Sequence, residues 1–147
     1  MADIKNNSEA DRLYEEIRNL LISSRKKVIT TVNSALVMTY WKVGKMIVDA
    51  QGGEDRATYG ISLLKNISGR LSKEFGKGFD VSNLRYMRQF YITFPNCDAL
   101  RHNLSWTHYK KIIKVTNPTA REYYAMEAAE GNWSTRQLER QIACRRG

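Results

Sequence analysis

Residues 61–94 read ISLLKNISGRLSKEFGKGFDVSNLRYMRQFYITF, and this stretch decides the predicted fold. Apolar residues recur every three or four positions on both sides of a turn at residues 76–80, which contains two glycines. That spacing predicts two amphipathic helices, one over Tyr59–Phe75 and one from Ser82 or Asn83 to Phe94. Gly76 can take the left-handed conformation that ends a helix, so the layout is that of a helix-turn-helix.

The second of these helices has an apolar side and a polar side. The apolar side is expected to pack against the first helix and gathers Leu84, Met87, Phe90, Tyr91 and Phe94. The polar side gathers Ser82, Arg85, Tyr86, Gln89 and Thr93, with Arg88 at the boundary. Arginine pairs with guanine and glutamine with adenine in the major groove of DNA, and both side chains also bind phosphate. The polar side is therefore a candidate recognition surface, with an ordinary solvated helix face as the alternative.

Basic residues that flank this helix would hold the DNA backbone. The backbone N–H groups at the start of the helix, near Ser82, also suit a phosphate. We predict that Arg85, Arg88 and Gln89 face bases or phosphates. The remaining predicted nucleic-acid-binding residues, which would contact the backbone, are Arg70, Lys73, Lys77, Ser82 and Arg101.

The distribution of charge along the chain supports that assignment. The 147 residues include 24 Lys and Arg against 15 Asp and Glu, a formal net charge of +9. Residues 61–120 hold ten of the basic and three of the acidic residues and so carry +7, whereas residues 1–60 and 121–147 carry +1 each. This balance favours a polyanionic partner, either nucleic acid or, less often, an anionic membrane surface. A solvated basic face without a partner is the alternative.

The rest of the chain is also predicted to be helical. One apolar stripe from Glu9 to Ala50 predicts a single long helix, with a possible break at the β-branched residues 28–32. Three further helices are predicted from Ser105 to Val115, from Thr119 to the residue before Gly131, and from Ser134 onward. Capping boxes are predicted at the starts of the last two, Thr119–Glu122 and Ser134–Gln137.

The predicted fold class is all-α, a helix-turn-helix or winged-helix-like domain with a long N-terminal helix. No convincing strand is found, although a short β-wing could lie within residues 96–103, and a loop is predicted around residues 51–58. In the predicted organisation, residues 1–8 are disordered and residues 9–95 form the long helix and the helix-turn-helix. Residues 96–147 form a C-terminal helical part packed on the same domain.

Residues that carry chemistry are sparse. There is no phosphate-binding loop and no zinc-protease motif. Cys97, Cys144, His102 and His108 stand at no ligand-like spacing, and His108 is expected at the surface or its edge. We therefore expect no metal site, no cofactor and no catalytic residue in this chain. No apolar run is long enough to span a membrane, so we expect no membrane association and a cytoplasmic, reduced protein.

The aromatic residues are numerous for this length. The chain has three Trp, eight Tyr and four Phe. Base stacking is one reading of such a set. For Trp41, Trp106 and Trp133 we favour core packing, with the indole N–H at the edge of the core.

Six runs of residues are distinctive: Leu36–Lys45, Phe75–Phe79, Asn83–Tyr91, Leu104–Tyr109, Ala120–Tyr124 and Trp133–Ile142. Together they resemble the N-terminal domain of YhcG-type bacterial proteins, over residues 10–142. The resemblance implies a winged-helix-like DNA-binding module that a PD-(D/E)-x-K nuclease domain follows in the family. This chain ends at Gly147, where the family would continue, so nuclease activity is not expected of it and it is either an excised domain or a short natural relative.

A weaker similarity links residues 104–142 to the helical module of ParB-type proteins. It suggests a second helical pair, for which a packing or dimer role is as reasonable as DNA contact. The leading hypothesis is a domain that binds duplex DNA, with RNA possible and a nuclease domain in cis in relatives. The alternative is a protein-interaction module or homodimer formed by the long N-terminal helix, with Tyr40, Trp41 and Ile47 in the interface.

Overall fold

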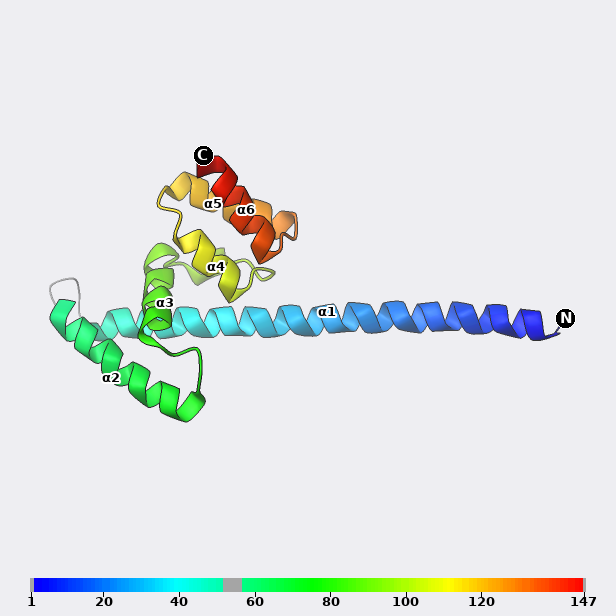
Figure 1. Ribbon diagram of the computed structural model, residues 1–147, viewed down its shortest axis with the longest axis horizontal. Helices are drawn as coiled ribbons and strands as arrows, with labels where there is room; N and C mark the ends of the chain where they lie inside the picture. Colours follow the sequence, from blue (N-terminus) through cyan, green and yellow to red (C-terminus); the bar gives the residue numbers. More distant parts are fainter. Residues whose placement is uncertain (1, 52–56, 147) are drawn as a thin grey trace. The chain divides into compact units, whose positions relative to one another are not determined.

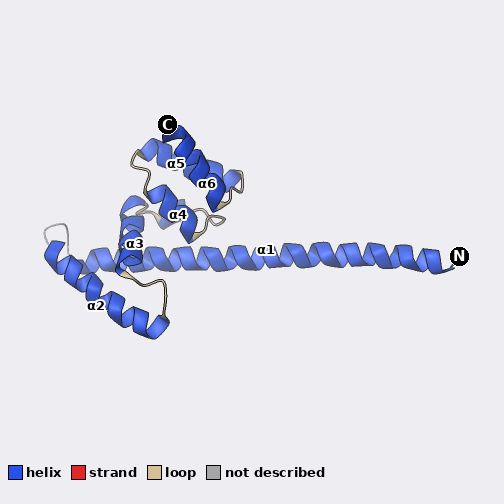
Figure 2. Ribbon diagram, in the orientation of Figure 1, coloured by secondary structure: helices blue, strands red, loops and turns tan. Residues whose placement is uncertain are grey.

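A computed structural model describes residues 2–51 and 57–146, with side chains described for residues 9–50 and 60–144. Its elements are α1 (Ala2–Gln51), α2 (Ala57–Phe75), α3 (Val81–Thr93), the short 3-10 helix η2 (Cys97–Ala99), α4 (Trp106–Ile113), α5 (Pro118–Glu130) and α6 (Thr135–Arg146) (Figures 1 and 2). No strand occurs in the described ranges. The predicted all-α class with a long N-terminal helix is confirmed.

The chain divides into two units within α1. The first unit is Met1–Val32, and the second, Asn33–Gly147, contains the remainder of α1 and all later helices. Our organisation of residues 9–95 and 96–147 as two parts of one domain stays a prediction. The predicted loop at residues 51–58 falls mostly on residues 52–56, which lie outside the described residues.

Helix α1 is longer than predicted and is unbroken. It begins at Ala2 rather than at Glu9, and so includes residues 2–8, for which we predicted disorder. It also continues through residues 28–32. No glycine or proline precedes Gly44, and β-branched residues lower helix propensity only slightly, so no residue in this range ends the helix.

The predicted turn between α2 and α3 is confirmed. Gly76 has φ +84° and Gly78 has φ +105°, both in the region that favours glycine. The N–H of Gly76 donates to the carbonyl of Ser72 at 3.0 Å and ends α2. The Asn83 side chain in α3 donates to the carbonyl of Gly78, which ties the turn to the helix that follows it.

The apolar side of α3 lies at the centre of the second unit. Leu84, Met87 and Phe90 are completely buried, as the helical pattern predicted. Leu84 and Met87 belong to a cluster with Ile47 and Leu64, while Phe90 belongs to a larger cluster of the C-terminal helices. Helix α3 therefore has both clusters at its back, which leaves its opposite side toward solvent.

Two tryptophans hold α3 in position through their ring N–H groups. Trp41 is buried, and its Nε1 donates to the carbonyl of Phe94 at 2.7 Å. Trp106 is half-buried, and its Nε1 donates to Oδ1 of Asn83 at 3.1 Å. Core packing with a hydrogen-bonded edge, which we favoured over base stacking, describes both residues. Because Trp41 and Ile47 belong to the core, the predicted interface that included them is wrong.

The segment that was a candidate for a β-wing forms a 3-10 turn instead. The Asn96 side chain accepts a hydrogen bond from the backbone N–H of Asp98 at 3.0 Å and starts η2. Further along, the N–H of Arg101 donates to the hydroxyl of Tyr109 at 2.6 Å. These local bonds take up backbone groups that a strand ladder would need, so no wing is formed in residues 96–103.

Helices α4, α5 and α6 pack on one another, and α4 also packs on α3. His108 is buried, contrary to the surface position that we predicted. Its Nδ1 accepts from the backbone N–H of Ser105 at 3.1 Å, and its Nε2 lies 2.7 Å from the carbonyl oxygen of Trp133. A capping role and a bond to a distant segment explain the burial, since both ring nitrogens have partners.

Of the two predicted capping boxes, the one at the start of α5 is wrong and the one at the start of α6 is confirmed. Asn117, not Thr119, caps α5: its side chain accepts from the N–H groups of Thr119 and Ala120, and Pro118 occupies the first turn. The predicted capping box at α6 is confirmed. The N–H of Gln137 donates to Ser134 Oγ at 3.1 Å, and the N–H of Ser134 donates to Gln137 Oε1 at 2.7 Å.

Candidate nucleic-acid interface

The outer side of α3 presents polar residues to solvent. Ser82, Arg85 and Gln89 are exposed, as the helical pattern predicted, and Arg88 is half-buried at the boundary. Arg85 and Gln89 lie one turn apart on the same face. The Gln89 amide donates to Thr93 Oγ1 at 3.3 Å, which orients its side chain along the helix.

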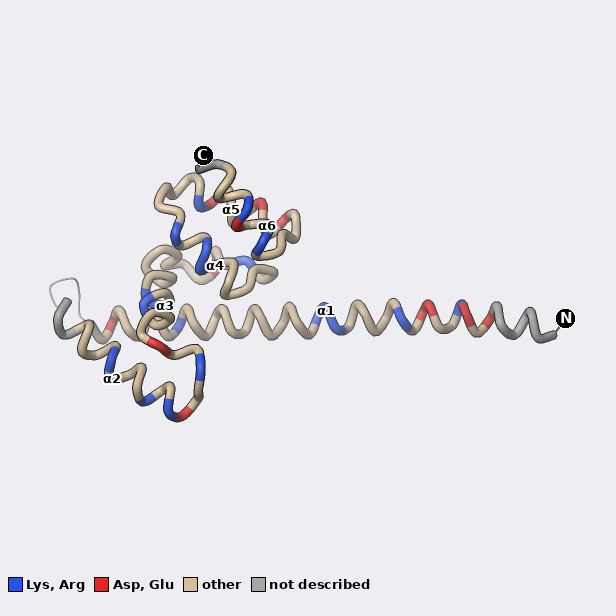
Figure 3. The backbone as a smooth tube through the Cα atoms, in the orientation of Figure 1, with Lys and Arg blue, Asp and Glu red and all other residues tan. Residues whose placement is uncertain are grey.

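Two lysines at the end of α4 extend this polar surface. Lys110 Nζ lies 5.9 Å from the ring centroid of Tyr86, and Lys114 Nζ lies 5.6 Å from the same centroid. Ammonium groups at this separation from an aromatic ring are attracted to its face. Tyr86 is on the edge of the outer side of α3 that adjoins α4. We call Arg85, Tyr86, Gln89, Lys110 and Lys114 the α3–α4 basic surface. Figure 3 shows where Lys and Arg fall along the backbone of α3 and α4.

The sequence interpretation missed Lys110 and Lys114. A signal was present, because the two residues are four positions apart at a helix end and belong to the segment that carries +7. The sequence alone could not show that these two lysines lie near Tyr86, because that proximity depends on the packing of α4 against α3.

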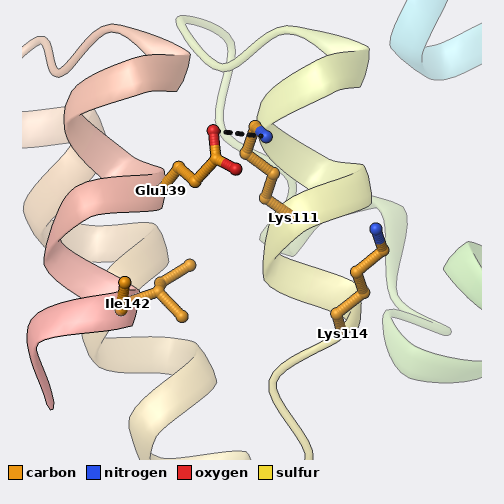
Figure 4. A pocket seen from close by; sticks show the side chains of 5 residues that line it. Lys111, Lys114, Glu139 and Ile142 are labelled. Atoms are coloured by element: carbon orange, nitrogen blue, oxygen red, sulfur yellow. Dashed lines mark ion pairs between the residues drawn. The ribbon is translucent and has the colours of Figure 1, made fainter. Parts of the chain in front are cut away.

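Lys111 has a different environment from Lys110 and Lys114. Its Nζ lies 3.2 Å from Glu139 Oε2 on α6, and both side chains line a cavity of about 240 Å³ (Figure 4). Figure 4 shows Lys114 at the end of the helix that carries Lys111, with its ammonium group directed away from the Glu139 carboxylate. Within the described side chains, neither Lys114 nor Lys110 has an acidic partner. Their charges are therefore less compensated than that of Lys111.

The predicted backbone contacts on α2 and the following turn are all exposed. Arg70 and Lys73 lie on α2, with Lys73 in its last turn, and Lys77 lies in the turn itself. A positive charge at a helix C-terminus is favourable because of the helix dipole, so Lys73 also has a structural reason for its position. None of the three forms an ion pair with the side chains that the structure describes.

Arg101 differs from the other predicted contacts because it has an acidic partner. Its Nη2 lies 3.4 Å from Glu122 Oε1 on α5, and its side chain is 32% exposed. It follows η2 in the loop before α4, rather than the α2–α3 turn. Its role toward phosphate stays a prediction, and the structure does not bring it together with the α3–α4 basic surface through any described hydrogen bond or ion pair.

The described residues contain no group of three or more His, Cys, Asp and Glu side chains that could hold a metal ion. Among the same residues, no helix combines the length and the apolar character that crossing a membrane requires.

Fold and surface together define a class of protein: a small, basic, all-α domain built around a helix-turn-helix layout. The chain belongs to the family of the DUF1016 N-terminal domain, which matches residues 16–146. It is similar to a protein of Escherichia coli (strain K12) whose name is "Putative nuclease YhcG", with 32% identity over 165 aligned positions. The alignment covers 90% of this chain but 44% of that relative, so the chain spans less than half of the relative's length. No solved structure matches the chain.

Proposed function

We propose that this chain binds duplex DNA through the α3–α4 basic surface, as the targeting module of a nuclease-type protein. The observation that carries the proposal is the pair of ammonium groups 5.9 and 5.6 Å from the Tyr86 ring, beside the exposed Arg85 and Gln89. Uncompensated charges gathered from two helices form a favourable site for phosphates. The relative's name supports a nucleic acid as the partner.

Some residues of this surface would contact the DNA backbone, and others would contact the bases. Lys110 and Lys114 are point charges on flexible side chains and suit phosphates of the DNA backbone. Arg85 and Gln89 carry the paired donor and acceptor groups that read guanine and adenine edges in the major groove. Helix α3 would lie in the groove, and the lysines of α4 would contact the adjacent strand.

The nuclease activity implied by the relative's name would belong to a second domain acting in cis. This chain would hold the DNA, and the cleaving groups would come from elsewhere. A DNA ligand also agrees with the cytoplasmic location that the sequence predicts.

A salt-dependent titration tests the proposal. Fluorescence anisotropy of a labelled duplex is measured with the wild-type chain, with Arg85→Ala/Gln89→Ala and with Lys110→Ala/Lys114→Ala. We expect each double variant to weaken binding by about tenfold or more near 100 mM salt, with the salt slope of the lysine variant lowered by about 2. An RNA duplex of the same sequence serves as competitor and decides between the two nucleic acids.

The matched control is Lys42→Ala. Lys42 is an exposed residue of α1. The backbone of Gly44 faces α3, and Lys42, two residues earlier, therefore projects from the opposite side of α1. Its loss should change affinity by less than about twofold, apart from the small effect of net charge. Unchanged binding in both double variants would exclude the α3–α4 basic surface as the DNA site.

A protein-interaction role is the second candidate, and a separate observation favours it. In the first unit, α1 exposes a series of large apolar side chains between Leu13 and Val32. Exposed apolar surface on this scale is typical of interaction sites.

A further inference from the structure

The outer side of α2 is a second basic face, which shares no residue with the α3–α4 basic surface. At 100° per residue, six members of residues 60–75 fall within about 140° of the helix circumference. Three are basic, three are small, and all six are exposed. We call this set the α2 basic face: Ser62, Lys65, Asn66, Gly69, Arg70 and Lys73.

Long basic side chains surround a centre of small residues on this face. Lys65 and Arg70 lie on its two edges, and Lys73 lies between the edges, in the last turn of α2. From Lys65 to Lys73 the face is about 12 Å long. An added Cβ at Gly69 would meet nothing within 4 Å, so a ligand can approach the helix backbone there. Lysine, arginine, serine and asparagine are all side chains that contact phosphates in protein–DNA interfaces.

The charges of the α2 basic face are uncompensated. Within residues 60–75 the one acidic residue is Glu74, and it lies outside the face, about 40° beyond Arg70. Among the described side chains, no ion pair involves Lys65, Arg70 or Lys73. None of the six members is a large apolar residue, which a helix needs in order to lie on a membrane. The face therefore fits the phosphate backbone of a nucleic acid better than a lipid surface.

The α2 basic face and the outer side of α3 point away from each other. Helices α2 and α3 pack together, and Leu64 of α2 shares a buried cluster with Leu84 and Met87 of α3. On α2, Leu64 lies on the side opposite the basic face. On α3, Leu84 and Met87 lie on the side away from Arg85 and Gln89. Because the two helices meet through these buried sides, their outer sides face in different directions.

From this arrangement we infer that the chain holds two segments of DNA at once, one at the α3–α4 basic surface and one at the α2 basic face. The inference rests on the DNA binding proposed above for the α3–α4 basic surface. Duplex DNA is stiff over about 150 base pairs, so a short duplex does not bend around the domain to reach both faces. Arg70 and Lys73, which the sequence predicts to hold the DNA at α3, would hold the second segment.

A sandwich capture with the full chain tests whether a second segment is held. A short biotinylated duplex is fixed to beads, the chain is added, and retention of a second, fluorescent duplex is measured at about 100 mM salt. The wild type should retain the fluorescent duplex, and Lys65→Ala/Arg70→Ala/Lys73→Ala should retain about tenfold less. Alanine is the best helix former, so this variant should fold. Its anisotropy titration with one duplex should weaken by less than about threefold, because the α3–α4 basic surface is intact.

The matched control removes three exposed basic residues from the first unit, as Arg18→Ala/Arg25→Ala/Lys26→Ala. It should capture the second duplex as well as the wild type does. Equal capture by the wild type and the α2 variant would overturn the inference, because the second segment would then be held elsewhere, for example by another copy of the chain. Equal losses in both triple variants would also overturn it, since net charge would then be the cause.

Substitutions at Gly69 test the face without removing a basic residue. Gly69→Glu and Gly69→Gln add side chains of similar size to the open centre of the face, and both residues favour a helix more than glycine does. Only glutamate adds a negative charge, which repels phosphate. Gly69→Glu should therefore reduce capture of the second duplex several times more than Gly69→Gln does, and equal capture by the two variants would contradict the inference.

The same measurements separate a failure of this inference from a failure of the proposed function. A wild type that binds one duplex in the anisotropy titration but captures no second duplex would overturn the inference alone. If Lys110→Ala/Lys114→Ala and Arg85→Ala/Gln89→Ala bind as the wild type does, while the α2 variant binds no duplex, the α2 basic face is the single DNA site. Both the inference and the proposed α3–α4 site would then be wrong.

Discussion

Gly44 of α1 and Met87 of α3 are in backbone contact at the point where the two helices cross. A Cβ atom at position 44 would overlap the carbonyl oxygen of Met87, well inside any allowed contact distance. The absence of a side chain at this position lets α3 approach α1 closely enough to bury Leu84, Met87 and Phe90. The crossing therefore sets the position of the helix whose outer side we propose to bind DNA.

The first prediction concerns this crossing. Gly44→Ala should lower the free energy of unfolding by about 1–3 kcal/mol, because α1 and α3 must separate to admit the methyl group. Urea denaturation followed by circular dichroism measures the change. Gly69→Ala is the control: Gly69 lies in α2 with nothing within 4 Å of an added Cβ, so this substitution should stabilise the domain by up to about 1 kcal/mol. Equal stability of Gly44→Ala and wild type would contradict the close crossing.

The second prediction concerns His108, which joins the start of α4 to the segment before α6. His108→Ala removes the hydrogen bond between His108 Nε2 and the Trp133 carbonyl oxygen, and it leaves the Ser105 N–H without its acceptor. Because two buried hydrogen bonds are lost, we expect the free energy of unfolding to fall by about 2–4 kcal/mol. The exposed His102 lies 3.2 Å from Ser34 Oγ, and His102→Ala should cost less than about 1 kcal/mol. Thermal unfolding of both variants provides the comparison.

The third prediction is a pH dependence that comes from Tyr109. Burial raises the pKa of the Tyr109 hydroxyl above its ordinary value, against the lowering effects of the Arg101 N–H bond and the Arg101 charge. Because the pKa is raised in the folded state, the neutral phenol contributes stability below the pKa of the unfolded chain. That contribution is lost as the pH rises above about 10.

Denaturation of wild type and Tyr109→Phe between pH 8 and pH 11 tests this sign. Tyr109→Phe should be less stable by about 1–2 kcal/mol at pH 8, because the N–H of Arg101 loses its acceptor. The difference between the two proteins should shrink toward pH 11. A gap that widens with pH would mean that the sign is wrong.

The fourth prediction separates two lysines that are three positions apart. Lys111 is paired with Glu139 at 3.2 Å, while Lys114 has no acidic partner among the described side chains. If the α3–α4 basic surface binds phosphate, Lys114→Ala should weaken duplex binding several times more than Lys111→Ala does. Glu139→Gln should strengthen binding, since it frees the Lys111 charge. The same anisotropy titration measures all three, and an equal loss in both alanine variants would be evidence against this division.

Local sequence determined the helical content and most of the helix ends. The glycines at 76 and 78, the capping box at Ser134 and the periodicity of α3 each act over a few residues, so their effects can be read without knowing the fold. The same reasoning correctly separated the buried Leu84, Met87 and Phe90 from the exposed Arg85 and Gln89. The start of α1 and the cap of α5 were misplaced, because competing local signals differ little in energy.

Contacts between residues far apart in the chain were decided only by the tertiary structure. Packing of α4 on α3 brings Lys110 and Lys114 close to Tyr86. The packing of the C-terminal helices also brings His108 to the carbonyl of Trp133, which is 25 residues away in the sequence. The tertiary structure also buries Trp41 in the core, which excludes it from the predicted interface, and leaves the large apolar side chains of residues 9–32 exposed. A helical pattern shows which residues share a side of a helix, but only the packing of other helices determines which side is covered.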